Sequence, residues 1–169
     1  MAAIVEIDEE NGKVSSPALT HNISNSNMGS VDAANLNPIA SPIAPGNNSF
    51  EKWQLLHVID MGTSSSINNL RVWRSGNLGV NAIHLTNASS SAYRGEAKYR
   101  TPTDSTSPFA IFPMPTSSPG SANLGIAGSL SGSLTENGSS DFLVYQIQTT
   151  RAALAGSTTV MNYSYDETA

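Results

Sequence analysis

The sequence predicts an all-β fold, namely a β-sandwich (Ig-like or jelly-roll-like) of roughly eight strands with an extended N-terminal arm and a Pro-rich segment. Several stretches alternate apolar and polar residues with a period of two, and clusters of turn-forming residues separate them. Serine, threonine and asparagine supply 55 of the 169 residues, and these types favour strands and turns over long helices. Helical blocks rich in Ala, Glu, Lys and Leu are missing from the chain.

The N-terminal part is expected to be a hairpin or arm with a Pro-containing extended segment over residues 1–48, before a sandwich domain over residues 49–169. A weakly alternating stretch at 4–8 precedes Asn11-Gly12, a pair that suits a type I′ turn, so residues 14–23 are expected to return as a strand.

Residues 25–48 contain three prolines among Asn, Ser and small apolar residues. Proline fixes φ and cannot donate to a strand ladder, so this stretch is expected to be an extended surface segment or an edge strand. A structureless loop of this length is unusual inside a domain. The segment is therefore expected either to lie on a neighbouring molecule or to wrap its own sheet.

The run at 50–61 is the most apolar continuous stretch, and both of its alternating faces carry apolar side chains. This pattern predicts a central strand covered on both sides for part of its length. Further strands are expected at residues 67–74, 82–86, 97–100, 141–150 and 158–166.

The stretch Leu124–Leu134 also alternates, with Leu124, Ile126, Leu130 and Leu134 at even positions and small or polar residues between them. Such alternation predicts a strand with one buried face. Its glycines match neither the G-x-x-x-x-G-K-[ST] nor the G-x-G-x-x-G phosphate-binding pattern, so they are interpreted as strand glycines.

Composition argues against several classes of function. The net charge is −5 and the chain has no basic run, so we expect no nucleic-acid partner. No apolar run approaches the ~20 residues of a membrane span, and the acidic N-terminal stretch does not resemble a signal peptide, so no membrane partner is expected. The absence of cysteine excludes disulfides, thiolate metal sites and Cys nucleophiles.

No residue of the sequence is assigned a catalytic, cofactor-binding or metal-binding role, and we expect no cofactor and no enzymatic activity. His21, His57 and His84 are far apart in sequence without metal-ligand spacing, and His57 is interpreted as a hydrogen-bonded core or rim residue. A Ser-His-Asp set has no G-x-S-x-G elbow to support it. The acidic run 8–10 could offer oxygen ligands to calcium but lacks EF-hand spacing, and a solvated hairpin tip is the favoured interpretation.

Aromatic side chains offer one alternative function, a carbohydrate-stacking platform, although core aromatics are the simpler interpretation. The candidates are Trp53, Trp73, Tyr93, Tyr99, Tyr145, Tyr163 and Tyr165. A glycan-binding adhesion module requires several of these rings to be exposed in one groove.

Six segments together resemble a family of small tailed-bacteriophage virion structural proteins. They are NISNSNMGSVDAANL at 22–36, NSFEKWQLLHV at 48–58, INNLRVWRSGNLG at 67–79, PMPTSSPGSANLGIAGSLSG at 113–132, DFL at 141–143 and YDETA at 165–169. The likeness covers nearly the whole chain. It implies a β-sandwich virion component without an enzymatic role.

The resemblance leads us to expect a capsid decoration (cement) protein, assembled in the host bacterial cytoplasm and carried in the virion. Its expected partners are other virion proteins, the major capsid protein first and tail proteins as the alternative. A tail, baseplate or fibre-associated component is the alternative role within the same class. A homo-oligomer is expected because capsid surfaces offer symmetric positions.

Overall fold

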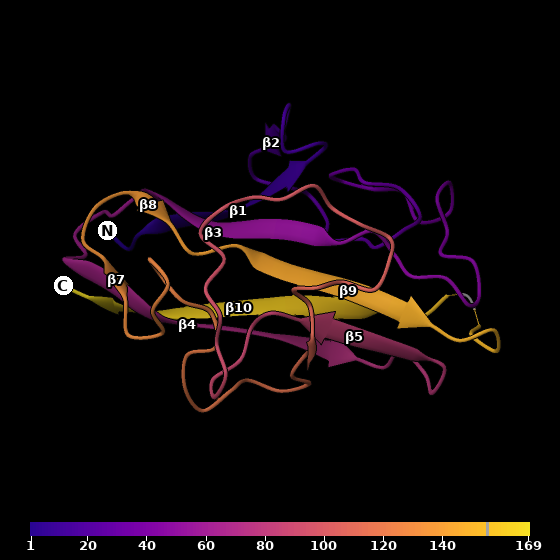
Figure 1. The fold of residues 1–169 in the computed structure, drawn as a ribbon. Helices are drawn as coiled ribbons and strands as arrows, with labels where there is room; N and C mark the ends of the chain where they lie inside the picture. Colours follow the sequence, from indigo (N-terminus) through magenta and orange to yellow (C-terminus); the bar gives the residue numbers. More distant parts are fainter. Residues whose placement is uncertain (155) are drawn as a thin grey trace.

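The computed structural model describes residues 1–154 and 156–169, and within them the protein is all-β, with two antiparallel sheets packed together as a sandwich (Figure 1). The strands are β1 (Ile4–Asn11), β2 (Ala18–Thr20), β3 (Lys52–Asp60), β4 (Ser66–Gly76), β5 (Ala82–Thr86), β6 (Phe112–Pro113), β7 (Ser133–Leu134), β8 (Gly138–Ser139), β9 (Leu143–Thr149) and β10 (Thr159–Thr168). The predicted all-β sandwich is confirmed.

The larger sheet has the order β2-β1-β3-β9-β5-β6, with β8 also paired to β3, and the smaller sheet has the order β10-β4-β7. The main core lies between the sheets and includes Leu56, Val58, Leu70, Val72 and Leu143. These residues come from alternate positions of β3, β4 and β9, as expected for strands with one face turned inward.

The outer face of the larger sheet carries a second core around the fully buried Trp53 of β3. The Trp53 ring lies 5.2–5.6 Å, centroid to centroid, from Tyr99, Phe109 and Phe142. The segment after β5 arches over β3 and β9 and supplies two of these rings (Figure 1). The prediction that residues 50–61 form a strand covered on both sides is therefore confirmed.

The N-terminal hairpin forms, but the expectation of an arm separate from the sandwich is wrong. Strand β1 pairs with β2 on one side and, from Ile4 to Glu10, with β3 on the other, so it is an internal strand of the larger sheet. The connection between β1 and β2 spans residues 12–17 and is longer than a two-residue Asn-Gly turn. A boundary at residue 48 therefore cuts through the larger sheet.

Residues 22–48 wrap their own sheet, which is the second of the two predicted alternatives. They contain no strand, and Leu36 is buried beside Gly29 with 4% of its surface exposed. Backbone hydrogen bonds tie Ser30 to Ser41 and Phe50 to Gly29. The prolines keep this segment out of the ladders, while Leu36 still packs within it and backbone hydrogen bonds hold it to the sheet.

We expect Gly29→Ala to destabilise the protein by about 1–3 kcal/mol, because overpacking forces the surrounding chain to move. A Cβ atom at Gly29 would lie 2.5 Å from the Ser41 carbonyl oxygen and 2.7 Å from Leu36 Cδ2. Urea denaturation measures the loss. Gly120→Ala is the matched control, because a Cβ atom there meets no atom within 4 Å. Equal stability of the two variants would contradict tight packing of this segment.

The stretch Leu124–Leu134 is not the predicted strand. The chain reverses at Ala127-Gly128, where φ is +51° and +79°, and Ile126 and Ser129 exchange backbone hydrogen bonds across the turn. Leu124 and Ile126 are buried before the turn, whereas Leu130 is only partly buried after it. Paired positive φ values define the tight hairpin turn that reverses a chain within two residues, so the apolar alternation does not belong to one face.

Candidate functional site

Two carboxylates and two imidazoles meet on the outer face of the larger sheet. Glu6 and Asp8 are two residues apart on β1 and therefore point to the same face. His57 lies directly opposite Glu6 on β3 in the antiparallel register. His21 follows immediately after β2, whose last residue pairs with Glu9, so it approaches from the other side of β1.

Asp8 is the centre of this cluster, hereafter the His–Asp cluster (Glu6, Asp8, His21 and His57). Its Oδ2 atom lies 2.8 Å from His21 Nδ1 and 2.9 Å from His57 Nδ1. The Glu6 Oε1 atom lies 3.5 Å from each of the same two nitrogens. The second Asp8 oxygen accepts a hydrogen bond from the Asn22 backbone N–H at 3.0 Å, which fixes the carboxylate orientation.

Burial falls across the cluster from one side to the other. The Asp8 side chain is 2% exposed and that of Glu6 is 15% exposed, whereas those of His57 and His21 are 26% and 59% exposed. The cluster is therefore anchored within the sheet and open to solvent beside His21. The Nδ1 atoms of His21 and His57 can donate N–H hydrogen bonds to Asp8. In the tautomer without a proton on Nδ1, they can instead bind a cation together with the two carboxylates.

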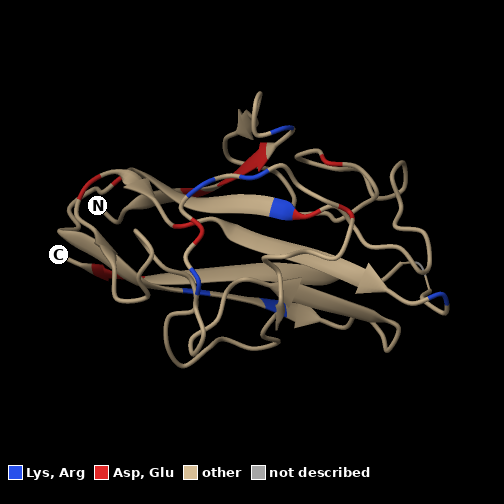
Figure 2. Cartoon of the chain, in the orientation of Figure 1, with Lys and Arg blue, Asp and Glu red and all other residues tan. Residues whose placement is uncertain are grey.

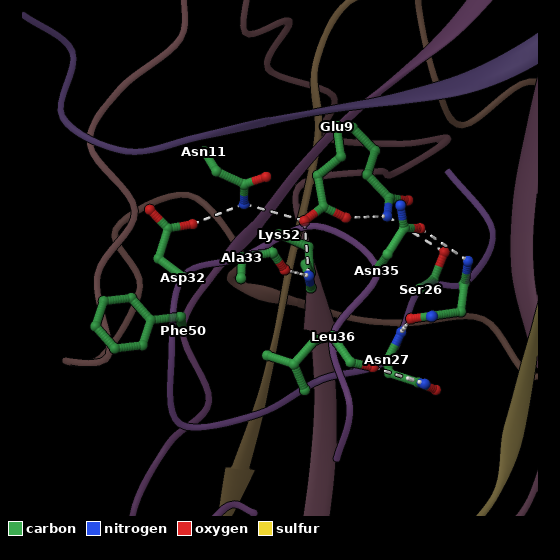
Figure 3. Close-up of polar contacts among 12 residues, drawn as sticks. Glu9, Asn11, Ser26, Asn27, Asp32, Ala33, Asn35, Leu36, Phe50 and Lys52 are labelled. Atoms are coloured by element: carbon green, nitrogen blue, oxygen red, sulfur yellow. Dashed lines mark hydrogen bonds and ion pairs between the residues drawn. The ribbon is translucent and has the colours of Figure 1, made fainter. Parts of the chain in front are cut away.

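A separate polar network lies inside the sandwich, on the opposite face of β1 and β3 (Figure 3). Lys52 Nζ lies 2.6 Å from Glu9 Oε1 and donates to the Ala33 carbonyl at 2.6 Å. Asn11 and Gln54 donate their side-chain N–H groups to the two Glu9 oxygens at 3.0 and 2.9 Å. The network holds the segment after β2 against the sheet, because Lys52 and Asn11 bond to Ala33 and Asp32 of that segment. Its role is structural.

The buried network also reaches the smaller sheet. Tyr163 of β10 donates its hydroxyl to Gln54 Oε1 at 2.8 Å, and Gln54 Nε2 lies 3.2 Å from Ser26 Oγ. Burial is the main cause that raises the pKa of the Tyr163 hydroxyl, so it remains a neutral donor. One glutamine side chain therefore connects β1, β10 and the segment after β2.

His84 lies apart from the other two histidines. It is 5% exposed, packs edge-on against Tyr145 with ring centroids 5.2 Å apart, and neither ring nitrogen meets a hydrogen-bond partner among the described residues. Burial, followed by the charge of Arg74, lowers the pKa of His84 to about 3. His84 is therefore a neutral core residue at pH 7.

The His–Asp cluster was not predicted from the sequence, which instead indicated a group of acidic residues at 8–10. The run 8–10 does not form one oxygen site, because Glu9 points into the sandwich while Asp8 points to the outer face. His21 and His57 are 36 positions apart and meet only through the pairing of β1 with β2 and β3. The usable indication was Glu6-x-Asp8, since such carboxylates share one face of a strand.

The remaining candidates do not assemble into a site. Of the seven predicted platform aromatics, Trp53, Tyr99 and Tyr145 are buried and the other four are partly buried. Trp53 and Tyr99 belong to the outer core, whereas Tyr145 and Tyr163 pack with the inner core. Across the hydrogen bonds of residues 1–154 and 156–169, none joins a histidine ring to a serine hydroxyl.

Two of the most exposed apolar side chains lie on two loops at the end of the sandwich opposite both termini (Figure 1). The described residues of these loops are 77–81, 150–154 and 156–158. Asn81 Nδ2 donates to the Ala152 carbonyl and Ser157 Oγ donates to the Leu78 carbonyl, so hydrogen bonds join the loops. Val80 is 97% exposed and Leu154 is 88% exposed. We call this surface the distal end; its charged residue among those described is the exposed Arg151, and Figure 2 shows a basic residue at this end of the sandwich.

Comparisons with known proteins give no family. No family model, no curated protein and no solved structure matches this chain. In the part of the chain that the structure describes, no helix has the length and apolar character needed to cross a membrane.

Proposed function

We propose that this chain is a non-enzymatic structural protein of a tailed-bacteriophage particle, a decoration (cement) protein that binds the major capsid protein. It is made in the bacterial cytoplasm and carried in the virion. The sequence resemblance of the six segments supports the phage assignment. The distal end, where Val80 and Leu154 are exposed on two hydrogen-bonded loops, supports a role in binding other proteins.

The exposure of Val80 and Leu154 is the observation that carries the binding proposal. Fully burying a side chain of this kind is worth about 1.5–3 kcal/mol, so a partner that covers both gains appreciable affinity. Hydrogen bonds from Asn81 to Ala152 and from Ser157 to Leu78 join the loops that carry them. A preorganised apolar surface loses little conformational entropy when it binds.

The position in the particle is tested by copy number. Quantitative mass spectrometry of purified particles that contain the protein should find hundreds of copies, in proportion to the capsid lattice. Homo-oligomers should match the symmetry of the lattice sites. A handful of copies per particle would instead place the protein in the tail, baseplate or fibre, and absence from particles would overturn the phage assignment.

We expect Val80→Asp to reduce incorporation into particles by about tenfold or more, because it places a charge in the apolar contact. The thermal midpoint of the isolated protein should not change, since the side chain is 97% exposed. Val14→Asp is the matched control, because Val14 is also exposed but lies on the connection between β1 and β2. Equal incorporation of both variants would exclude the distal end as the contact.

A further inference from the structure

We propose that the His–Asp cluster binds one divalent transition-metal ion, with Zn²⁺ as the representative of this class. In a tetrahedral site with bonds of about 2.0–2.1 Å, neighbouring ligand atoms are about 3.3 Å apart. The four nitrogen–oxygen distances of the cluster are 2.8, 2.9, 3.5 and 3.5 Å. All four ligand atoms lie within 4.8 Å of one another, so small side-chain adjustments would bring them to the corners of a tetrahedral first shell.

The donor set selects the class of ion. Two imidazole nitrogens with two carboxylate oxygens suit Zn²⁺ and its first-row neighbours, whereas Ca²⁺ and Mg²⁺ prefer shells of oxygen alone. An ion here would replace the two hydrogen-bond contacts between the imidazole Nδ1 atoms and Asp8. It would also balance the charge of Glu6 and Asp8, which lie side by side on one strand.

The surroundings meet two further requirements of a metal site. The Asn22 N–H group holds the free oxygen of Asp8, which is the kind of outer contact that orients a ligating carboxylate. His21, at 59% exposure, leaves a path for the ion to enter from solvent. The deeper ligands come from β1 and β3, so the site is rigid on one side and accessible on the other.

The ion would join three parts of the chain that are distant in sequence. It would link β1, β3 and the residue after β2, and thereby fasten the N-terminal hairpin to the sandwich. Because a ligand that binds only the folded state stabilises it, the thermal midpoint should rise with the metal concentration. This inference concerns the hairpin and does not depend on the proposed virion role.

The test uses the full, tag-free chain after treatment with EDTA, and titrates it with Zn²⁺ by isothermal calorimetry. We expect one ion per chain and an increase of about 5–10 °C in the thermal midpoint at a hundredfold excess over Kd. Titration with Co²⁺ should give the visible absorption of a tetrahedral site with nitrogen and oxygen ligands. Binding of more than one ion per chain at saturation, or no binding of either Zn²⁺ or Co²⁺, would overturn the proposal.

Two ligand variants and two controls locate the ion. His21→Gln and His57→Gln should each weaken Zn²⁺ binding by at least 10-fold, and His21→Gln should leave the metal-free protein folded because its side chain is exposed. Glu10→Gln removes a carboxylate from the same face of β1 outside the cluster, and His84→Leu removes a histidine elsewhere. Both controls should keep the parental affinity. Unchanged affinity in both ligand variants would place the ion elsewhere and reject the site.

Discussion

Lys52→Met is expected to lower the free energy of unfolding by about 3–5 kcal/mol, because it leaves the Glu9 carboxylate buried without its cation. The Glu9 side chain is fully buried and that of Lys52 is 3% exposed, with 2.6 Å between Nζ and Oε1. The amide groups of Asn11 and Gln54 would still donate to Glu9, but they carry no balancing charge. Urea denaturation at pH 7 measures the loss.

The surface pair between Arg71 and Asp166 is the matched control. It has the same 2.6 Å separation between nitrogen and oxygen, but the Asp166 side chain is 52% exposed. Arg71→Met should therefore cost only about 0–1 kcal/mol. Adding Glu9→Gln to Lys52→Met should restore part of the lost stability, because it removes the unpaired charge. Equal losses in the Lys52 and Arg71 variants would contradict the buried-charge explanation.

Stability below pH 6.5 should depend strongly on His84. Burial and Arg74 lower the pKa of His84 to about 3 in the folded protein, whereas an unfolded histidine titrates near 6.5. Between these pH values His84 is protonated in the unfolded chain but neutral in the folded chain. The free energy of unfolding therefore decreases as the pH falls. From pH 7 to pH 4 the loss amounts to about 3 kcal/mol.

His84→Leu should remove this part of the pH dependence. At pH 7 the variant should remain within about 1 kcal/mol of the parent, because neither nitrogen of the His84 ring has a protein partner to lose. Measuring both proteins from pH 7 to pH 4 cancels the titration of the carboxylates that they share. If the free energies of unfolding of the parent and the variant changed equally with pH, protonation of His84 would cost no stability. That result would contradict its burial as a neutral ring.

The sequence was sufficient to predict the sandwich and its longest strands, because these show a period of two or, at 50–61, a continuous apolar run. The predicted strand at 82–86 coincides with β5, and those at 67–74, 141–150 and 158–166 overlap β4, β9 and β10. The strand predicted at Leu124–Leu134 is wrong, because alternating apolar residues do not show where a chain reverses. The reversal depends on Ala127 adopting positive φ, and alanine gives no indication of that conformation.

The His–Asp cluster could not be predicted in full because it depends on strand register. Glu6 meets His57 only in the observed pairing of β1 with β3, and a slip of one residue would send Glu6 to the interior. The prediction that the N-terminal residues form an arm was wrong for a related reason. A single weakly alternating strand gives no indication of whether it lies at an edge or inside a sheet, and β1 lies inside.

The smaller sheet has a consequence for how the chain folds. Its main ladder joins β4 to β10, and the paired residues are 83 to 102 positions apart in sequence. Pairing over such distances must overcome a large loop-closure entropy before any contact is gained, which slows folding. While β10 is being synthesised, β4 lacks its longest partner, and its inward side chains Ile67, Leu70 and Val72 lack part of their cover. Completion of β10 is therefore the step that ends the period in which the nascent chain is most prone to aggregate.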